Sequence, residues 1–578
     1  MPITHFRSDL DRREFLTVAG CTIATFLLPS KTIASTPVTA ALFSASGLTK
    51  FVDQLPIPPV IDATGGGTID LPMAPSFHSF HSSLPSASTW GYGGASYLGP
   101  TINARRGVEV NVVAANQLAT HPLAFAIDTE LHGALESDKT QPRVSLHLHG
   151  GNTAPESDGH PEDTFLPGTS KTYHYQNDQE AANLWYHDHA LGITRLNVMA
   201  GLAGFYLLRD DFDTGDGSNP IGLPWGPYEI PLVIQDRLFE EDGKLAYPAG
   251  PLQTWSPEFF GDTAVVNGKA FPNLDVQRGL YRFRVINGSN ARVYDLYLSN
   301  GQAFFQIGGD GGLLDAPVLL GHLVLAPGER ADLLIDFSDY APGTKIVLKN
   351  NARVPFPDGP RNAQRGGLPL QDLMQFTVGS AIGFAGGIPL TIRPTPIIPL
   401  PAPVRVRNLS LVEIMDMEED EPLMARLNNL PWGTTDIETT VVDTVEQWNI
   451  INTTGDTHPI HLHLVQFQVL SRQRFRVGAY TEAYYEHLEH ELTGPYPVPS
   501  ADAFRIGRAR MPDPNERGWK DTVRANPGEI TSILVPFGAN AAPGVPFGQS
   551  FTGDYVWHCH ILEHEDNEMM LPYKVVAS

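Results

Sequence analysis

The chain has 578 residues, of which 42% are hydrophobic and 18% charged, and its formal net charge is −25 at pH 7. This length exceeds what one hydrophobic core usually serves, so we expect two to four domains. The negative charge disfavours a nucleic-acid partner, because binding phosphates requires a basic surface. The 54 Gly and 49 Pro favour many short strands joined by turns over long helices.

Residues 1–41 have the layout of a twin-arginine export signal. The pair Arg12-Arg13 precedes an uncharged stretch from Thr17 to Ser30, and small residues follow toward the expected cleavage region, Ser35 to Ala41. The stretch is too short and too rich in Thr for a membrane span, so we expect no stable membrane insertion. We predict export by this route to the periplasm or the extracellular medium. Two alternatives are a chance Arg pair in a disordered N-terminus and lipoprotein-type cleavage at Cys21.

Cysteine is sparse in this chain. Only Cys21 and Cys559 occur, and removal of the signal would take Cys21 with it, so the mature chain could form no internal disulfide. A lone thiol in an oxidising compartment is open to damage unless something holds it. We therefore expect Cys559 to bind a metal.

Three segments of the chain resemble one another, which indicates an internal repeat. Residues 106–112 lead to Asn116, residues 278–286 lead to Asn287, and residues 444–451 lead to Asn452. Each segment alternates two kinds of residue with period two, as a strand with one buried face does. The spacing of roughly 170 residues predicts three similar β-domains in a row. Their expected ranges are 42–212, 213–380 and 405–578, with a linker over 381–404 whose main part is rich in Pro.

Histidines gather in four His-x-His pairs, all of which lie in the outer two predicted domains. In an extended segment, residues i and i+2 point to the same face, so each pair can present two imidazoles side by side. Four converging pairs would enclose several metal ions shared between pairs. The pairs are His147/His149, His187/His189, His461/His463 and His558/His560.

A second ligand set surrounds the mature cysteine. Cys559, His564 and Met569 lie in one segment at offsets of five and ten, and His458 can supply a second imidazole. Two His and one Cys with a weak axial Met are the ligands of a blue-copper electron-transfer site. Zinc is the competing metal, but eight clustered imidazoles beside this set exceed any structural zinc requirement.

Four motifs carry a resemblance to the multicopper oxidases: His-Leu-His-Gly-Gly at 147–151, Trp-Tyr-His-Asp-His at 185–189, His-Pro-Ile-His-Leu-His at 458–463 and His-Cys-His-Ile-Leu-Glu-His at 558–564. Residues 157–159, 518–522 and 564–570 are most similar to the bacterial branch that contains spore-coat laccases, bilirubin oxidases and phenoxazinone synthase. The resemblance implies an all-β fold of three consecutive cupredoxin-like Greek-key β-sandwich or barrel domains.

The resemblance also implies four copper ions: one type 1, one type 2 and a type 3 pair. For type 1 copper the implied ligands are His458, Cys559, His564 and Met569, and for type 2 copper His147 and His461. For the type 3 pair they are His149, His187 and His560 on one ion and His189, His463 and His558 on the other.

Two acidic residues are implied as proton donors near the cluster, Glu565 and Asp158. For Glu565 the alternative is a hydrogen-bonded residue that orients the site.

By this resemblance the protein is a laccase-like oxidoreductase. Electrons would pass singly from phenols, aromatic amines or bilirubin-like donors through the type 1 site, Cys559 and its neighbours His558 and His560 to the cluster, where dioxygen is reduced to water. Its expected partners are a small-molecule donor and O2, and we expect a monomer.

Three rival functions fit the sequence less well. A cuprous oxidase for copper tolerance usually carries a Met-rich segment, and the ten Met here form no such cluster. A copper-free exported structural homologue would have lost ligands, and a two-domain nitrite reductase would lack the third repeat.

Two further features have no assigned role. The acidic run 416–421 favours a solvated loop over a cation site. The insertion 472–517, which holds His487 and His490, favours a surface loop over an edge of the substrate site.

Overall fold

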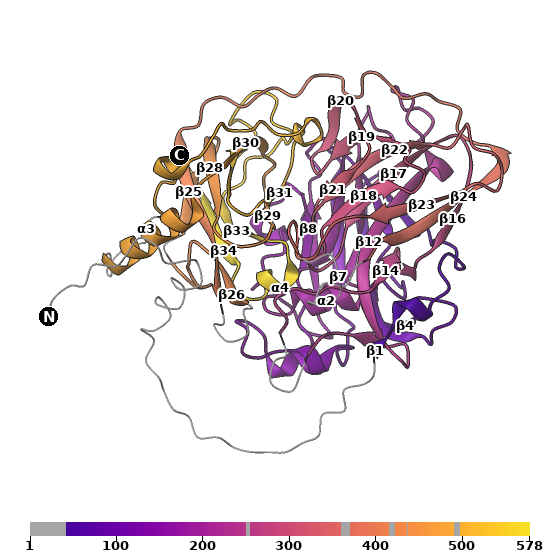
Figure 1. Cartoon of the computed structure of the whole chain (residues 1–578), viewed down its shortest axis with the longest axis horizontal. Helices are drawn as coiled ribbons and strands as arrows, with labels where there is room; N and C mark the ends of the chain where they lie inside the picture. The colour runs from indigo at the N-terminus through magenta and orange to yellow at the C-terminus, as the bar shows by residue number, and fades with distance from the viewer. Residues whose placement is uncertain (1–41, 250–254, 360–369, 416–421, 436, 491–497) are drawn as a thin grey trace, which may run out of the picture.

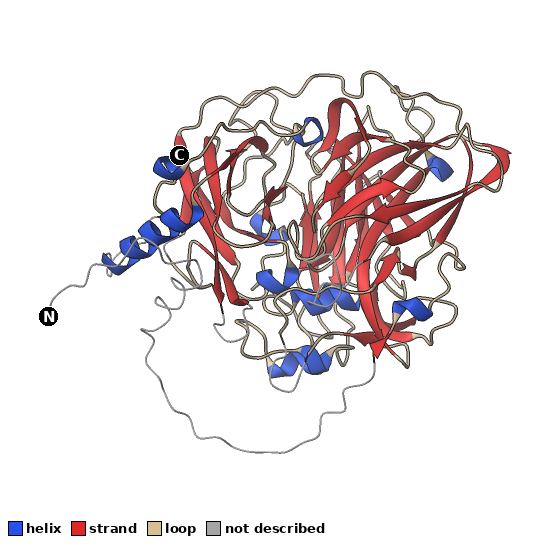
Figure 2. Cartoon of the chain, in the orientation of Figure 1, coloured by secondary structure: helices blue, strands red, loops and turns tan. Residues whose placement is uncertain are grey.

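The computed structural model describes residues 42–249, 255–359, 370–415, 422–435, 437–490 and 498–578, so the predicted signal peptide and the acidic run 416–421 lie outside the described residues. The described chain is dominated by strands, which confirms the predicted all-β class (Figure 2). Its α-helices are α2 (Thr194–Ala200), α3 (Val477–His490) and α4 (Leu562–Glu565). Within these ranges, none of the helices has the length and apolar character to cross a membrane.

The first domain contains two sheets and a hairpin. The larger sheet has the order β2 (Val60–Ala63), β6 (Thr101–Arg105), β11 (Ala203–Arg209), β10 (Ala182–Asp188), β8 (Leu146–His149). The smaller sheet has the order β3 (Gly67–Asp70), β7 (Val110–Ala115), β9 (Ser170–Tyr175). The hairpin is β4 (Met73–His78) with β5 (Ala87–Tyr92).

The middle domain contains two larger sheets. One has the order β15 (Lys269–Ala270), β14 (Thr263–Val266), β12 (Glu229–Glu240), β17 (Leu280–Asn287), β22 (Arg330–Asp336), β19 (Phe304–Gly309), β20 (Gly312–Leu320). The other has the order β16 (Asn273–Arg278), β24 (Asp372–Ile382), β23 (Lys345–Asn350), β18 (Tyr294–Leu298), β21 (Leu323–Leu325). Strand β12 also pairs with β13 (Leu245–Ala246) and β1 (Leu42–Phe43). The segment just after the predicted signal therefore joins the middle sheet before the chain enters the first domain.

The third domain repeats the two-sheet arrangement. One sheet has the order β26 (Pro422–Leu427), β25 (Arg405–Met415), β28 (Val445–Asn452), β32 (Glu529–Pro536), β30 (Gln468–Arg474). The other has the order β27 (Glu438–Val441), β34 (Met570–Val576), β33 (Gly553–Cys559), β29 (His458–Leu462), β31 (Thr522–Ala525). Residues 383–404, all described, form no helix or strand and cross the top of the molecule from β24 to β25 (Figure 1).

The three segments predicted to be repeats occupy equivalent places in the three domains. Strands β7, β17 and β28 each pair in parallel with one neighbour (β3, β12 and β25) and antiparallel with the other (β9, β22 and β32). The Asn that ends each segment has the same role: Asn116, Asn287 and Asn452 each donate from the side-chain amide to two backbone carbonyls and accept the N–H two residues on. Each repeat is thus a strand whose end is fixed by the hydrogen bonds of an asparagine side chain.

In the two outer domains, the strands that carry the histidines are paired in the same way. Strand β10 pairs antiparallel with β8 in the first domain, and β33 pairs antiparallel with β29 in the third. All seven residues of β10 are buried, although only one face of the strand contacts its own domain core. On its other face, Asn183 contacts Val285 of the middle domain and His187 contacts His560 of the third domain, and this is where the candidate site lies.

Candidate metal centre

Strand alternation separates the histidines of the third domain from its cysteine. In β29 and β33 the side chains of Ile460, Leu462, Trp557 and Cys559 belong to the apolar core of that domain. Their neighbours His461, His463, His558 and His560 therefore lie on the opposite face, toward the first domain. His458 has the parity of Ile460, so it shares the cysteine's face. One strand pair thus supplies ligands to two separate sites.

The first and third domains bring their histidines together in two strand pairs. The register sets His187 opposite His147 and His461 opposite His558. Across the domain boundary, the ring centroids of His147 and His463 are 3.8 Å apart. The four His-x-His pairs therefore converge, as the spacing predicted.

The ring nitrogens of this cluster include three close triads among the described residues. In each triad, one ligand atom per residue lies within 4.8 Å of the others. The triads are His147, His149 and His461; His149, His187 and His560; His189, His463 and His558.

Hydrogen bonds to the outer nitrogens orient the rings of the cluster. The Nδ1 atoms of five imidazoles bond oxygen acceptors, which leaves Nε2 toward the other rings. These are His147 to Asp158 O (2.6 Å), His187 to Asp188 O (2.9 Å), His461 to Asp521 O (2.9 Å), His463 to Asp158 Oδ2 (2.7 Å) and His558 to Cys559 O (3.1 Å). His149 is reversed: its Nε2 lies 3.1 Å from Asp521 Oδ1, and its Nδ1 faces His187 Nε2 at 3.5 Å.

Burial favours the neutral form of His187 and His461. Desolvation is the largest cause that lowers the pKa of His187 to about 3 and that of His461 to about 4. Neutral imidazoles keep a lone pair for a metal ion. Among the described residues, His147 Nε2, His461 Nε2 and both ring nitrogens of His560 have no hydrogen-bond partner. Because buried polar atoms without partners cost free energy, the cluster fits a set of bound cations.

A second, smaller group surrounds Cys559. Its Sγ lies 3.5 Å from His458 Nδ1 and 3.9 Å from His564 Nδ1, and these two nitrogens are 3.2 Å apart. Thr454 Oγ1 lies 2.7 Å from His458 Nε2 and so fixes that ring with Nδ1 toward the sulfur. Met569 is fully buried, and its backbone bonds both His564 and Cys559. Burial raises the pKa of the Cys559 thiol well above its usual range, so a thiolate here needs a bound cation.

Both predicted acids border the imidazole cluster. Asp158 is buried and accepts a hydrogen bond from His463 Nδ1. Burial is the main cause that raises the pKa of Asp158 to about 8. Glu565 is buried on α4, with Oε2 3.1 Å from His558 Nδ1 and Oε1 3.5 Å from His189 Nδ1. The two carboxyl groups thus contact different imidazoles of one triad.

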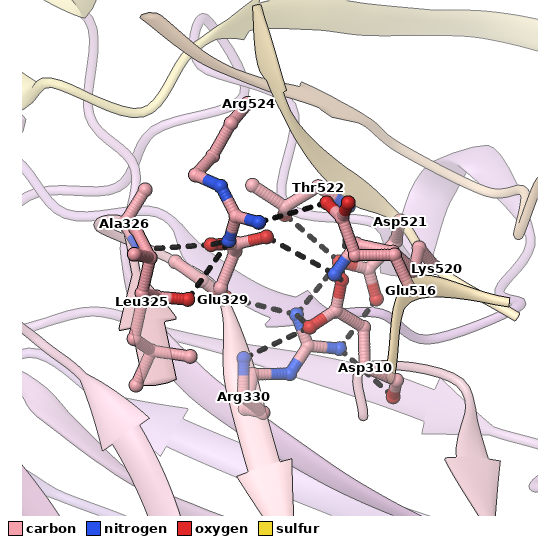
Figure 3. A network of polar contacts seen from close by, with 12 residues as sticks. Asp310, Leu325, Ala326, Glu329, Arg330, Glu516, Lys520, Asp521, Thr522 and Arg524 are labelled. Carbon is pink, nitrogen blue, oxygen red and sulfur yellow. Dashed lines mark hydrogen bonds and ion pairs between the residues drawn. The ribbon is translucent and has the colours of Figure 1, made fainter. Parts of the chain in front are cut away.

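Sequence reasoning missed a buried ion network beside the cluster. Asp521 contacts His149 and His461 and forms a forked ion pair with Arg330 of the middle domain (Figure 3). Burial alone would raise the pKa of Asp521, but Arg330 and His149 hold it well below its usual range. Asp521 lies in the segment 518–522 that carried part of the resemblance, whereas Arg330 lies in none of the motifs.

Proteins of known family resemble this chain over most of its length. Two family models described as multicopper oxidase match residues 137–212 and 404–578. The chain is 40% identical to a laccase of Bacillus subtilis over 553 residues, which covers 91% of this chain and 99% of that protein. It is 39% identical to a laccase of Bacillus stratosphericus, which covers 92% and 99%. The chain belongs to the multicopper oxidase family.

A solved structure of the family supports the fold. The McoA multicopper oxidase of Aquifex aeolicus aligns with a TM-score of 0.69 and 27% identity, covering 91% of this chain and 100% of that one. As a laccase-like multicopper oxidase, the protein is a copper-dependent oxidase with copper cofactors, a small-molecule reducing substrate and O2. The laccase relatives do not favour the rival functions.

Proposed function

We propose that the protein binds four copper ions and couples one-electron oxidation of phenols, aromatic amines or bilirubin-like donors to the four-electron reduction of O2 to water. The convergence of eight imidazoles beside a separate His-Cys-His group carries this proposal. Type 1 copper would be held by His458, Cys559, His564 and Met569, and type 2 copper by His147 and His461. The type 3 pair would be held by His149, His187 and His560 and by His189, His463 and His558.

When bound, copper supplies one-electron redox chemistry at the cysteine site and dioxygen reduction at the imidazole cluster. Cys559 joins the two places. Its thiol belongs to the His458–His564 group, while the flanking His558 and His560 face the cluster. The path between the sites therefore consists of one residue and its two covalent neighbours, which is short enough for the sites to act as a unit.

Dioxygen reduction to water consumes protons, and we assign their supply to Asp158 and Glu565. Asp158 can hold a proton at a carboxyl oxygen because burial raises its pKa to about 8. Asp158→Asn is expected to slow oxygen uptake by about 10²- to 10⁴-fold while anaerobic bleaching of the blue colour by donor keeps its rate. Asp163→Asn, on an exposed carboxylate of the same loop, is the matched control. Equal slowing of bleaching would count against this assignment.

The donor is best identified by steady-state comparison. We expect purified, copper-loaded protein to be intensely blue, to contain four coppers per chain and to consume O2 with at least one phenol, aromatic amine or tetrapyrrole. Cuprous and ferrous ions complete the panel. A colourless preparation fully loaded with oxidised copper would contradict the oxidase, and oxygen uptake with metal ions alone would contradict organic donors.

We also propose that the enzyme acts as a monomer. One chain supplies every candidate copper ligand and both acids, so a second copy is not needed to complete the site. Light scattering on the copper-loaded enzyme tests this, and activity that falls on dilution would contradict it.

A further inference from the structure

Arg330 of the middle domain is a fully buried guanidinium whose five N–H donors all have acceptors. Its Nε donates to Asn183 O at 3.0 Å, one Nη1 bond goes to Gly328 O at 2.9 Å, and one Nη2 bond goes to Asp310 O at 3.1 Å. The remaining two form a fork with the carboxylate of Asp521, with Nη1 2.6 Å from Oδ1. This side chain therefore has one fixed orientation.

These contacts join all three domains at one point. Asn183 lies on β10, four residues before His187, and Asp521 directly precedes β31 of the third domain. Arg330 is the first residue of β22. The middle domain holds none of the clustered histidines, yet its arginine fixes the backbone of one histidine strand and the carboxylate beside another.

Asp521, together with the neighbouring Thr522, determines how the His149 ring lies. Its Oδ1 and the hydroxyl of Thr522 are each 3.1 Å from His149 Nε2. With Nε2 engaged in this way, Nδ1 is the atom turned toward His187. Five other imidazoles of the cluster are held by hydrogen bonds through Nδ1. His149 has the opposite orientation because its hydrogen bond to Asp521 is made through Nε2. Moving the carboxylate would leave this buried N–H with the Thr522 hydroxyl alone, or turn the ring.

Two glycines show how closely the surrounding backbone fits this arrangement. A Cβ at Gly328, whose φ is +80°, would lie 2.8 Å from the His560 ring. A Cβ at Gly150, whose φ is +84°, would lie 2.6 Å from both Arg330 Nη2 and Asp521 Oδ2. The turn before Arg330 thus also packs against His560, which belongs to the triad of His149, His187 and His560.

We propose that Arg330 is a positioning residue for the copper cluster: through Asp521 it fixes the His149 imidazole with Nδ1 toward His187 and His560. The inference rests on the proposed copper ligands, since it assigns His149 to the type 3 pair. Lysine cannot take this role, because an ammonium group lacks the planar fork that grips both carboxylate oxygens.

The test compares Arg330→Lys with Arg282→Lys. Arg282 is equally buried in the middle domain and forks to Asp213 and Asp332, where no clustered histidine takes part. In Arg330→Lys we expect the copper dissociation constant of the cluster to rise about 10- to 100-fold. The fraction of copper detectable by electron paramagnetic resonance should rise. Magnetic coupling between the two type 3 ions hides them from this measurement, and a displaced ligand would break that coupling. The blue colour from Cys559 should stay, and Arg282→Lys should keep all three properties.

An unchanged cluster in Arg330→Lys, with stability lowered as in Arg282→Lys, would overturn the proposal and leave only an interdomain ion pair. If Arg330→Lys does not accumulate, Asp521→Glu keeps the charge but moves the carboxylate by one methylene. The same rise in detectable copper is then expected, and an unchanged spectrum overturns the proposal. Failure of the wild-type protein to bind copper or turn blue would instead contradict the proposed function.

Discussion

The imidazole rings of His149 and His461 lie face to face across the contact between the first and third domains, with centroids 3.7 Å apart and planes 13° from parallel. His147 and His463 form a second stack across the same boundary. Each domain thus contributes half of the imidazoles, and each of the three triads named above takes residues from both domains. Assembly of the site therefore requires the two domains to dock.

Copper should stabilise the docked chain. Copper ions that bind only where the two domains meet favour the folded state over the unfolded one by about 4 kcal/mol per site when the free metal is 1,000 times its dissociation constant. We expect the chelated protein to unfold at a lower temperature than the loaded protein, as measured by scanning calorimetry. Re-addition of copper should restore the higher temperature. Identical transitions with and without copper would show that the histidines do not hold metal across the boundary.

Cys559→Ser should abolish the proposed type 1 site and leave the imidazole cluster intact. A hydroxyl group does not replace the thiolate, so the variant should lose its blue colour and its oxygen uptake. Copper bound at the imidazole cluster should remain, because His558 and His560 face away from the core that holds Cys559. Met569→Leu is the control: it should stay blue, with a higher reduction potential. Loss of cluster copper in Cys559→Ser would argue against two independent sites.

Period-two alternation was the part of the site that the sequence could predict. It placed His461 and His463 on one face of a strand, and in the structure Ile460 and Leu462 lie on the other face, in the domain core. It also identified the repeated strands, because Asn452 and its two counterparts end them in the same way. Such features depend on neighbours a few residues apart, which is the range over which a sequence pattern carries information.

The orientation of each ring could not be predicted in the same way. Whether an imidazole presents Nδ1 or Nε2 depends on an acceptor that the fold brings from elsewhere. Asp521 is 372 residues from His149 and 191 residues from Arg330. The pairing of Leu42 with Glu240 was missed for the same reason. No period in the sequence links the partners of these contacts, so only the folded chain reveals them.

Export by the twin-arginine route is a proposal that rests on Arg12-Arg13 and the uncharged stretch after it. Replacing both arginines by lysine keeps the charge but should abolish recognition, so the precursor should accumulate in the cytoplasm. Fractionation followed by immunodetection measures this, with Arg7→Lys as the control. Unchanged export of the double variant would exclude the route, and lipid labelling at Cys21 would favour the lipoprotein alternative.

Acid should destabilise the enzyme through a buried charge cluster in which Arg209 of the first domain meets Glu229, Arg282 and Arg284 of the middle domain. Burial alone would raise the pKa of Glu229, but Arg209, Arg284 and Arg282 lower it to about 2 from an ordinary value of 4.5. A depressed carboxyl pKa contributes stability that is complete above the unfolded value and is lost as pH falls from about 4.5 toward 2. The ionised Glu229 therefore contributes on the order of 3 kcal/mol at pH 7.

Glu229→Gln tests this contribution directly. At pH 7 the variant should be less stable than the wild type by about 3 kcal/mol in urea unfolding, because it leaves the three arginines short of one negative charge. The difference should shrink as pH falls from 4.5 toward 2, since the wild type then loses the same interaction. Glu136→Gln, which removes an exposed carboxylate paired only with Lys139, should change stability little at any pH. A deficit of Glu229→Gln that is independent of pH would assign the loss to packing rather than to charge.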